Sequence, residues 1–414
     1  MPTAQLYPTT GSDKPTNRVE RRPGAPGAPE SPRLGTKASN DVAGPPQDLT
    51  RRLERRDTKY ATRARQRSFT SIPRVAHCGF SMNANTTGVA LKIAGGVAYF
   101  AGVQTCGSVA ACAVCGPKIR QHRAAGADEA FKVATERGHG VLLMTPTCRH
   151  DRGMPLLDLR KRKEAAFRRF RQGRPWRALM AGEIVGWMNQ REITYGEAFG
   201  WHPHSHLGIV TATPKDDDQV EQLRAGLYPS WATSLAAEGL TAEETVRMAD
   251  GQIKHPGLDV RHGDAAVGDY MLKVRGHDQD LAMELMRGDL KEGRRGSRTP
   301  EQIRSDFIEY GEVRDRGLWR EYEQATAGAR MTTGLTALRR KLGLGDVELT
   351  DEEIVELRID GECLAVLSPA SWAAVRCASP GGSALLRAAE AGRHVEYLTE
   401  LLGTSGWMRG ATDG

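Results

Sequence analysis

Runs of apolar residues and alternating positions mark out the strands in the central part of the chain. Residues 141–144 form a continuous apolar run that ends in polar residues. Residues 186–195 and 201–210 indicate two extended segments, joined by a short turn at 196–200 that begins and ends with glycine. Short runs of this kind, bounded by turn residues, are typical of strands. The pattern therefore predicts a core strand near residues 140–147 and a β-hairpin over residues 186–210.

Apolar residues recur at helical intervals over much of the remaining chain. The helical segments predicted in this way are 118–137, 155–181, 215–250 and 300–342. Residues 257–261 predict another strand, residues 276–300 a charged, glycine-rich loop, and residues 347–403 a small helical or mixed module. Strands and helices in this order favour an α+β fold, in which an antiparallel central sheet carries helices on one face.

Three histidines stand at alternate positions in the second arm of the hairpin. Because the side chains of a strand have a period of two, His202, His204 and His206 would all point to one face. Neutral imidazole is the commonest metal ligand, and a His-x-His pair presents two nitrogens to one ion. The chain has only 11 histidines, so three within five residues favour a metal site over the surface histidines of an edge strand.

Glu192, in the first arm of the hairpin, is a candidate third ligand. Folding the hairpin at its turn brings Glu192 approximately opposite His204, and the register of the turn decides whether the two side chains share a face. Two imidazoles and one carboxylate leave coordination positions open, which suits a catalytic Mg²⁺ or Mn²⁺ ion. The alternative is that Glu192 is an ordinary cross-strand partner of an arginine or a lysine.

Four cysteines are grouped before the first core strand. They are Cys78, Cys106, Cys112 and Cys115. Four thiolates satisfy the tetrahedral preference of structural Zn²⁺, and two apolar runs around residues 95–96 predict a hairpin between the first two cysteines. Residues 74–125 therefore predict a small zinc ribbon. His77 could replace Cys78 as a ligand, a redox-active Cys-x-x-Cys pair is the alternative, and a disulfide is disfavoured because nothing indicates an oxidising compartment.

Positive charge is concentrated in the first seventy residues. Residues 1–70 contain 14 Lys and Arg against 7 Asp and Glu, a net charge of +7 that equals the net charge of the whole chain. This segment is rich in Pro, Gly and Ala and cannot bury enough apolar surface to offset its ordering entropy, so we expect a disordered arm. It could add salt-sensitive affinity for DNA, or it could be a solvating tail or untranslated sequence before a later start codon.

The segment 155–181 is a second basic region. It contains Arg168, Arg169 and Arg171 together with several aromatic residues. The functional interpretation is a surface that follows DNA phosphates, with the aromatics packed beneath it or stacked on bases. The alternative is an amphipathic helix with a solvated basic face. No apolar run approaches membrane-spanning length and the N-terminus has no apolar signal core, so we expect a cytoplasmic protein without membrane partners.

Tyr270 and Lys273 follow about sixty residues after the histidines, and they would share one face if their segment is helical. A tyrosine hydroxyl that attacks a phosphodiester forms a covalent phosphotyrosine and conserves the bond energy for later rejoining. A metal ion would polarise the scissile phosphate, and the lysine could stabilise charge or position the strand. The pair gains its significance from the histidine motif, because Tyr-x-x-Lys alone occurs everywhere by chance.

Together these motifs resemble the HUH endonucleases, and in particular the single-tyrosine initiators of plasmid rolling-circle replication found in actinomycetes. The resemblance is carried by residues 201–207 (Trp-His-Pro-His-Ser-His-Leu) and 270–273 (Tyr-Met-Leu-Lys), and it covers about residues 74–345. Two positions depart from the family. Ser205 stands where a bulky apolar residue is usual, and Ala266 stands where some relatives carry a glutamate that activates water at termination.

The resemblance implies a palm-like fold in which the strand at 140–147 lies beside the histidine strand. It implies a metal held by His204, His206 and Glu192, with His202 as an orienting neighbour or an auxiliary ligand, and Tyr270 as the nucleophile. The implied partners are single-stranded or cruciform origin DNA and a host helicase and polymerase. A conjugative relaxase or transposase of the same chemistry is the nearest alternative, and a non-catalytic zinc-ribbon DNA-binding regulator is an alternative from another class.

These expectations divide the chain into segments. They are a disordered basic arm (1–70), a zinc-binding ribbon (74–125), an HUH nuclease core (126–275), a loop with a helical extension (276–345) and a small C-terminal module (346–414).

Overall fold

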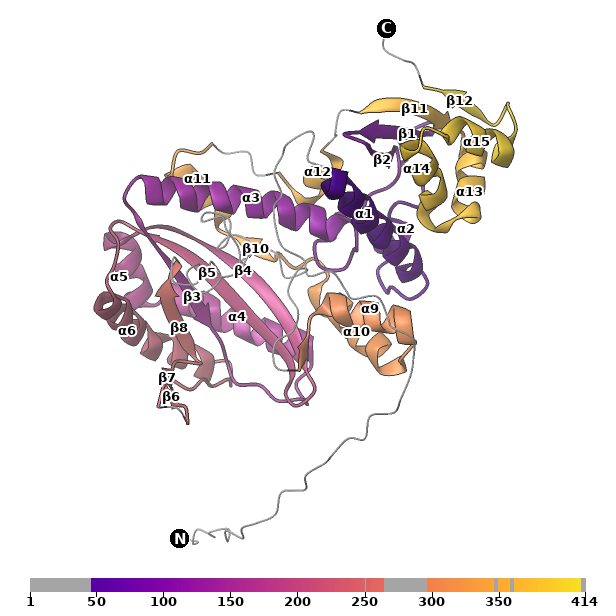
Figure 1. The fold of residues 1–414 in the computed structure, drawn as a ribbon. Coiled ribbons are helices and arrows are strands. Elements are labelled where there is room, and N and C mark those ends of the chain that lie inside the picture. The colour runs from indigo at the N-terminus through magenta and orange to yellow at the C-terminus, as the bar shows by residue number, and fades with distance from the viewer. Residues whose placement is uncertain (1–45, 250, 264–295, 346–348, 358–360, 411–414) are drawn as a thin grey trace, which may run out of the picture. The chain divides into compact units, whose positions relative to one another are not determined.

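The computed structural model describes residues 46–249, 251–263, 296–345, 349–357 and 361–410 (Figure 1). Its larger sheet is antiparallel, with the strand order β10-β4-β5-β3-β8, and β9 also pairs with β4. The strands are β3 (Gly140–Pro146), β4 (Ile184–Gly196), β5 (Gly200–Thr211), β8 (Leu258–His262), β9 (Ser297–Arg298) and β10 (Thr332–Thr333). The predicted hairpin is β4–β5, and β3 lies beside β5 as the resemblance implies. The α+β fold with an antiparallel sheet is confirmed.

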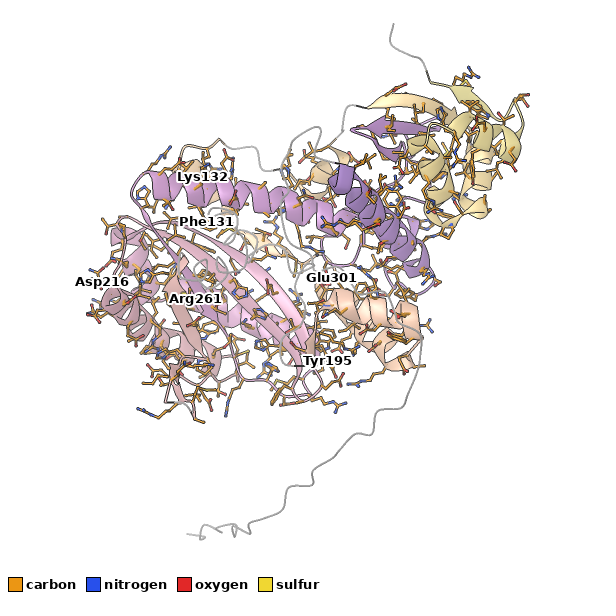
Figure 2. All side chains as sticks on the ribbon, in the orientation of Figure 1. Phe131, Lys132, Tyr195, Asp216, Arg261 and Glu301 are labelled. Carbon is orange, nitrogen blue, oxygen red and sulfur yellow. The ribbon has the colours of Figure 1, made fainter. Side chains whose placement is uncertain are left out.

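Helices cover both faces of this sheet, so the expectation of helices on one face is wrong. On one face, α4 (Leu156–Gln172), α5 (Arg174–Gly182) and α6 (Asp217–Ala236) pack against Leu207 and Ile209. On the other face, α3 (Cys115–Glu136) and α11 (Leu335–Lys341) pack against Val210. Figure 2 shows Phe131 of α3 and the exposed Lys132 beside it. Residues 207–211 are all buried, because a strand that is covered on both faces no longer alternates between buried and exposed side chains.

A second antiparallel sheet has the strand order β12-β11-β1-β2. Its strands are β1 (Val89–Ala94), β2 (Val97–Ala101), β11 (Glu362–Leu367) and β12 (Trp407–Arg409). Its core includes residues of α13 (Pro369–Ala378), α14 (Ser383–Glu390) and α15 (His394–Leu402). The predicted hairpin thus forms, but it pairs with a C-terminal strand, Val89 lying opposite Leu367. The ribbon at 74–125 and the module at 346–414 are therefore not separate structures.

Residues 46–66, predicted to be part of a disordered arm, form helix α1 (Pro46–Gln66). Three of its polar side chains, those of Arg56, Arg63 and Gln66, are buried. Arg56 forms an ion pair with Glu390 of α14, and the Gln66 side chain donates a hydrogen bond to the carbonyl of Ala111 (2.7 Å). The disorder prediction fails here because these polar groups have fixed partners elsewhere in the fold, which composition alone does not reveal. Residues 1–45 lie outside the described part of the chain.

The remaining elements refine the predicted boundaries. The basic segment 155–181 is two helices, α4 and α5, and the helix predicted over 215–250 ends at Ala236. The segment 300–342 contains three helices and a short strand. The elements not yet named are α2 (Pro73–His77), β6 (Val246–Arg247), β7 (Ile253–Lys254), α9 (Pro300–Tyr310), α10 (Val313–Thr326), α12 (Asp351–Glu356) and the 3₁₀ turn η2 (Pro380–Gly382). Within the described residues, no helix combines the length and the apolar character needed to cross a membrane.

Candidate metal centres and nucleic-acid interface

Glu192, His204 and His206 converge on one point of the β4–β5 hairpin. The strand register pairs Glu192 directly with His204, so both side chains lie on the same face. The Oε2 atom of Glu192 lies 3.0 Å from Nε2 of His204 and 3.5 Å from Nε2 of His206. One ligand atom of each residue lies within 4.8 Å of the other two. The register that the sequence left open therefore brings the three predicted ligands together.

The hydrogen bond on the far side of the His204 ring indicates that the nitrogen facing Glu192 carries a lone pair and not a proton. Nδ1 of His204 lies 3.3 Å from the carbonyl oxygen of His202, which can only accept a hydrogen bond. The proton of a neutral ring therefore belongs on Nδ1, and Nε2 presents its lone pair to the carboxylate. Burial lowers the pKa of His204, which disfavours a second proton on the ring. Two electron-pair donors 3.0 Å apart fit a shared divalent cation.

Thr145 of β3 holds the second imidazole. Its Oγ1 atom lies 3.1 Å from Nδ1 of His206, and this contact leaves Nε2 of His206 directed at Glu192. A hydrogen bond to the other ring nitrogen is the usual way in which a metal-binding histidine is oriented. Thr145 was assigned no role from the sequence.

His202 has a different partner from its two neighbours. Its ring centroid lies 5.1 Å from that of His204, but its Nδ1 atom lies 2.6 Å from Nε2 of His150. Nδ1 of His150 donates to the carbonyl of Phe199 (3.0 Å), so the proton between the two rings belongs to His202. Burial lowers the pKa of His150, and it lowers that of His202 to about 2. His202 is thus held in place by His150, a residue that sequence reasoning did not assign to the site.

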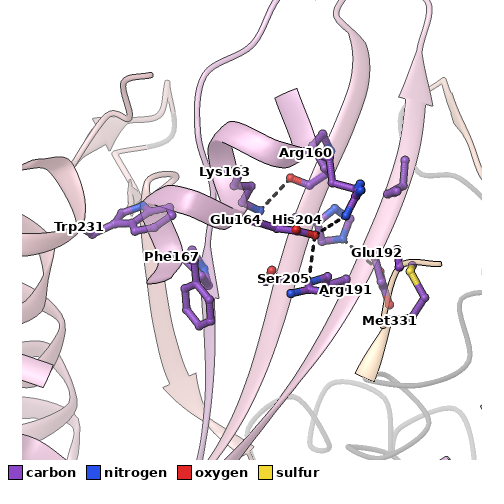
Figure 3. Close-up of a pocket in the computed structure, with 14 residues that line it drawn as sticks. Arg160, Lys163, Glu164, Phe167, Arg191, Glu192, His204, Ser205, Trp231 and Met331 are labelled. Carbon is purple, nitrogen blue, oxygen red and sulfur yellow. Dashed lines mark hydrogen bonds and ion pairs between the residues drawn. The ribbon is translucent and has the colours of Figure 1, made fainter. Parts of the chain in front are cut away.

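A small cavity of about 30 Å³ lies along α4, and Glu192 and His204 are among its lining residues (Figure 3). Glu164 of α4 binds Arg160 (2.7 Å) and Arg191 (3.5 Å) at its wall. Lys163, also on α4, donates to the carbonyl of Pro203 (2.8 Å), and burial lowers its pKa to about 8. Helix α4 therefore contributes two basic side chains, those of Arg160 and Lys163, to the wall of this cavity.

The four predicted cysteines also come together. The sulfur atoms of Cys78, Cys106, Cys112 and Cys115 all lie within 4.8 Å of one another, and all four residues are buried. Separations such as 3.6 Å between Cys78 and Cys115 are far longer than a disulfide bond. Hydrogen bonds from neighbouring thiols, that of Cys106 above all, lower the pKa of Cys112. The cluster is compatible with a zinc site.

His77 does not compete with Cys78 in this cluster. His77 is exposed to solvent, and its Nδ1 atom lies 3.1 Å from the hydroxyl oxygen of Ser81. It is not among the four converging residues. The backbone N–H groups of Val114 and Cys115 donate to the sulfur of Cys112 (3.5 and 3.4 Å), at the start of α3. This turn joins the two cysteines of the Cys-x-x-Cys pair.

The three predicted DNA-binding arginines of α4 have different environments. Arg168 is exposed, whereas Arg169 forms an ion pair with Glu238 (3.5 Å). The guanidinium of Arg171 lies 5.1 Å from the ring centres of both Phe167 and Trp187. The other aromatic side chains of this segment, Phe170 and Trp176, are buried in the core. Tyr270 and Lys273 lie outside the described residues.

Two curated proteins share sequence similarity with the chain. "Protein rep" of Streptomyces lividans is 26% identical over 321 residues, which cover 64% of this chain and 70% of that protein. "Neomycin resistance protein" of Streptomyces cyanogenus is 27% identical over 162 residues, which cover 33% of this chain and 37% of that protein. No protein-family model matches the chain, and no solved structure matches it.

Proposed function

We propose that the chain is a plasmid replication initiator that nicks and rejoins one strand of its origin DNA. The observation that carries this proposal is the convergence of Glu192, His204 and His206 on one point. The similarity to "Protein rep" of Streptomyces lividans supports a role in plasmid replication. The resemblance of the histidine motif to HUH endonucleases supports the nicking chemistry.

Glu192, His204 and His206 would hold Mg²⁺ or Mn²⁺, which supplies Lewis-acid polarisation of the scissile phosphate. Thr145 orients the His206 ring and the carbonyl of His202 fixes the tautomer of His204. Both contacts hold Nε2 atoms toward the carboxylate before DNA binds. Such preorganisation is what a catalytic metal site requires of its surroundings.

Tyr270 is the proposed nucleophile. Its phenolic oxygen forms a bond to the scissile phosphorus, the bond from phosphorus to the 3′ oxygen breaks, and the phenolic proton is passed on so that a 3′ hydroxyl is left. Lys273 would stabilise the developing charge or position the strand. The 5′ end remains on the tyrosine until a second attack rejoins it, while the 3′ hydroxyl primes a host polymerase behind a host helicase.

The four cysteines would bind a structural Zn²⁺ ion. Tetrathiolate sites are typical of structural zinc and offer no open position to a substrate. The site would fix the turn at residues 112–115 and the start of α3.

Covalent capture tests the proposed function. The full-length protein is incubated with Mn²⁺ and a supercoiled plasmid that carries its own gene with flanking DNA, and the adduct is digested and mapped by mass spectrometry. We expect a nicked plasmid and a nucleotide attached to Tyr270. Tyr270→Phe should abolish nicking while DNA binding survives, and nicking by that variant at the wild-type rate would overturn the assignment.

A further inference from the structure

We propose that a cavity between α4, β4 and β10 binds a nucleotide of the single-stranded DNA, with arginines on its phosphate and an aromatic wall on its base. This inference rests on the proposed function and names a contact of its substrate. The volume of the cavity is about 360 Å³. Its wall includes Phe167, Arg168 and Arg171 of α4, Trp187 and Arg191 of β4, and Thr333 of β10. The volume falls within the range of sites that accept small organic ligands.

The cavity carries more positive than negative charge. Among the described residues that line it, three carry guanidiniums, Arg168, Arg171 and Arg191, and only Glu164 carries a carboxylate. Glu164 is already shared between Arg160 and Arg191. Among the residues that the structure describes, no carboxylate forms an ion pair with Arg168 or Arg171. An anion in the cavity would therefore meet uncompensated positive charge, as a DNA phosphate requires.

Arg171 adds a second observation that indicates a ligand. Its Nε atom is buried and has no hydrogen-bond partner within the described part of the chain. Burial and the neighbouring Arg191 and Arg168 lower the pKa of Arg171, which means that the charged guanidinium is destabilised in the free protein. A buried polar atom without a partner is costly, and a phosphate oxygen beside Arg171 would relieve both the lost hydrogen bond and the repulsion between the arginines.

The aromatic wall explains why the ligand would be a nucleotide and not an isolated anion. Trp187 is half-buried, and its ring meets that of Phe167 at an interplanar angle of 82°. The guanidinium of Arg171 lies over both rings. Stacking of bases on aromatic rings and guanidinium planes is the common way in which proteins hold single strands.

The cavity adjoins the candidate metal site. It shares Glu164, Phe167 and Arg191 with the cavity that Glu192 and His204 line. Arg191 and Glu192 are neighbours in β4, so their side chains point to opposite faces of the strand. The cavity therefore lies on the other face of β4 from the side chains of the metal ligands, and the residues that the two cavities share connect it to the candidate metal site.

A matched pair of variants tests the inference, because two adjacent exposed arginines have different surroundings. Arg168 lines the cavity, whereas Arg169 does not and pairs with Glu238. The affinity of the full-length protein for a 5′-fluorescein-labelled 20-mer of deoxythymidine is measured by fluorescence anisotropy in EDTA, over a series of salt concentrations. We expect R168Q to lose at least about fivefold in affinity and to reduce the salt slope by about 0.7, the value for one phosphate on a single strand. R169Q should retain the wild-type affinity and slope.

Cross-linking supplies an independent readout that does not depend on a variant folding. An oligonucleotide with 5-iododeoxyuridine at successive positions is irradiated with the wild-type protein, and the linked peptide is mapped. We expect cross-links to Trp187 or Phe167. Equal losses in R168Q and R169Q, or cross-links that avoid both aromatics, would overturn the inference. Because binding is measured in EDTA, a failure of DNA cleavage leaves this test unaffected.

Discussion

The Nε2 atom of His204 lies 3.0 Å from the Oε2 atom of Glu192, its direct partner across β4 and β5. The far nitrogen of the same ring faces the carbonyl of His202, so the near nitrogen presents a lone pair to the carboxylate. His206 adds a third donor to the same point. A carboxylate that merely paired with an arginine across the hairpin would not be arranged in this way. The contact is the basis of the proposed metal site.

Replacing Thr145 by valine should weaken metal binding without removing a ligand. The change keeps the shape of the side chain but removes the hydroxyl that lies 3.1 Å from Nδ1 of His206. We expect the affinity for Mn²⁺ to fall about tenfold or more, since the outer hydrogen-bond partners of metal ligands typically contribute about 10–100-fold. Isothermal titration calorimetry measures the affinity. Thr147→Val is the control, because that hydroxyl donates to the carbonyl of Pro256. An unchanged affinity in T145V would show that Thr145 does not orient the ligand.

Lys163 should make the stability of the protein depend on pH in the alkaline range. Burial lowers the pKa of Lys163 from 10.5 to about 8, so between these values the unfolded chain binds more protons than the folded one. The free energy of unfolding should therefore rise with pH across this window, by at most about 3 kcal/mol. Below pH 8 both states are protonated and the dependence disappears.

Urea unfolding at pH 7.5, 9 and 10 measures this effect against Lys163→Met, which removes the titrating group. The stability of the wild type relative to K163M should increase from pH 7.5 to pH 10, while Lys161→Met, at an exposed position of the same helix, should follow the wild type at every pH. A difference between the wild type and K163M that stays constant with pH would contradict the assignment.

Substitution of one clustered cysteine should release zinc. We expect the wild-type protein to contain about one zinc ion per chain and Cys106→Ser to lose it, because a structural site needs all four ligands. A colorimetric zinc assay on denatured, dialysed protein measures the content, and thermal unfolding measures the accompanying loss of stability. Cys363→Ser leaves the cluster intact and should keep its zinc. Wild-type protein that is free of zinc after purification without chelator would contradict the prediction.

Arg56 should stabilise the docking of α1 on the rest of the fold. It is buried with Glu390, both side chains being 8% exposed, and it also donates to the carbonyl of Ala98 (3.1 Å). Breaking a buried pair from one side leaves an uncompensated charge and typically costs about 3–5 kcal/mol. Arg56→Gln should lower the free energy of urea unfolding by that amount, whereas Arg55→Gln, at an exposed position, should change it little. If the two variants are equally stable, α1 does not depend on this contact.

Much of the candidate metal site could be predicted from sequence because it depends on local periodicity. Alternate histidines in a strand share a face whatever surrounds them, and the turn at 196–200 brings Glu192 near His204. The Thr145 and His150 contacts could not be predicted in the same way, because they depend on which strand lies beside β5 and how the loop after β3 runs. The four-cysteine group could be predicted from residue type and grouping, and the fold brings the two distant sulfurs to the Cys112–Cys115 turn.

The fold was predicted least well where partners are remote in sequence. The pairing of Val89 with Leu367 joins the first hairpin to the C-terminal module, and no local pattern specifies it. The composition of residues 1–70 favoured disorder, whereas Arg56 and Gln66 of α1 are buried against groups far along the chain. The sequence also could not distinguish Arg168, Arg169 and Arg171, which are near neighbours on one helix but have different surroundings.

The central claim is that Glu192 acts as a metal ligand together with His204 and His206. Isothermal titration of Mn²⁺ into the wild type and Glu192→Gln tests it most directly, with Glu197→Gln as a matched control, because Glu197 lies at the hairpin turn and pairs with Arg298 and Arg314. We predict a saturable site in the wild type and in E197Q, and at least about tenfold weaker binding in E192Q. Binding of Mn²⁺ by E192Q with the affinity of the wild type would contradict the account.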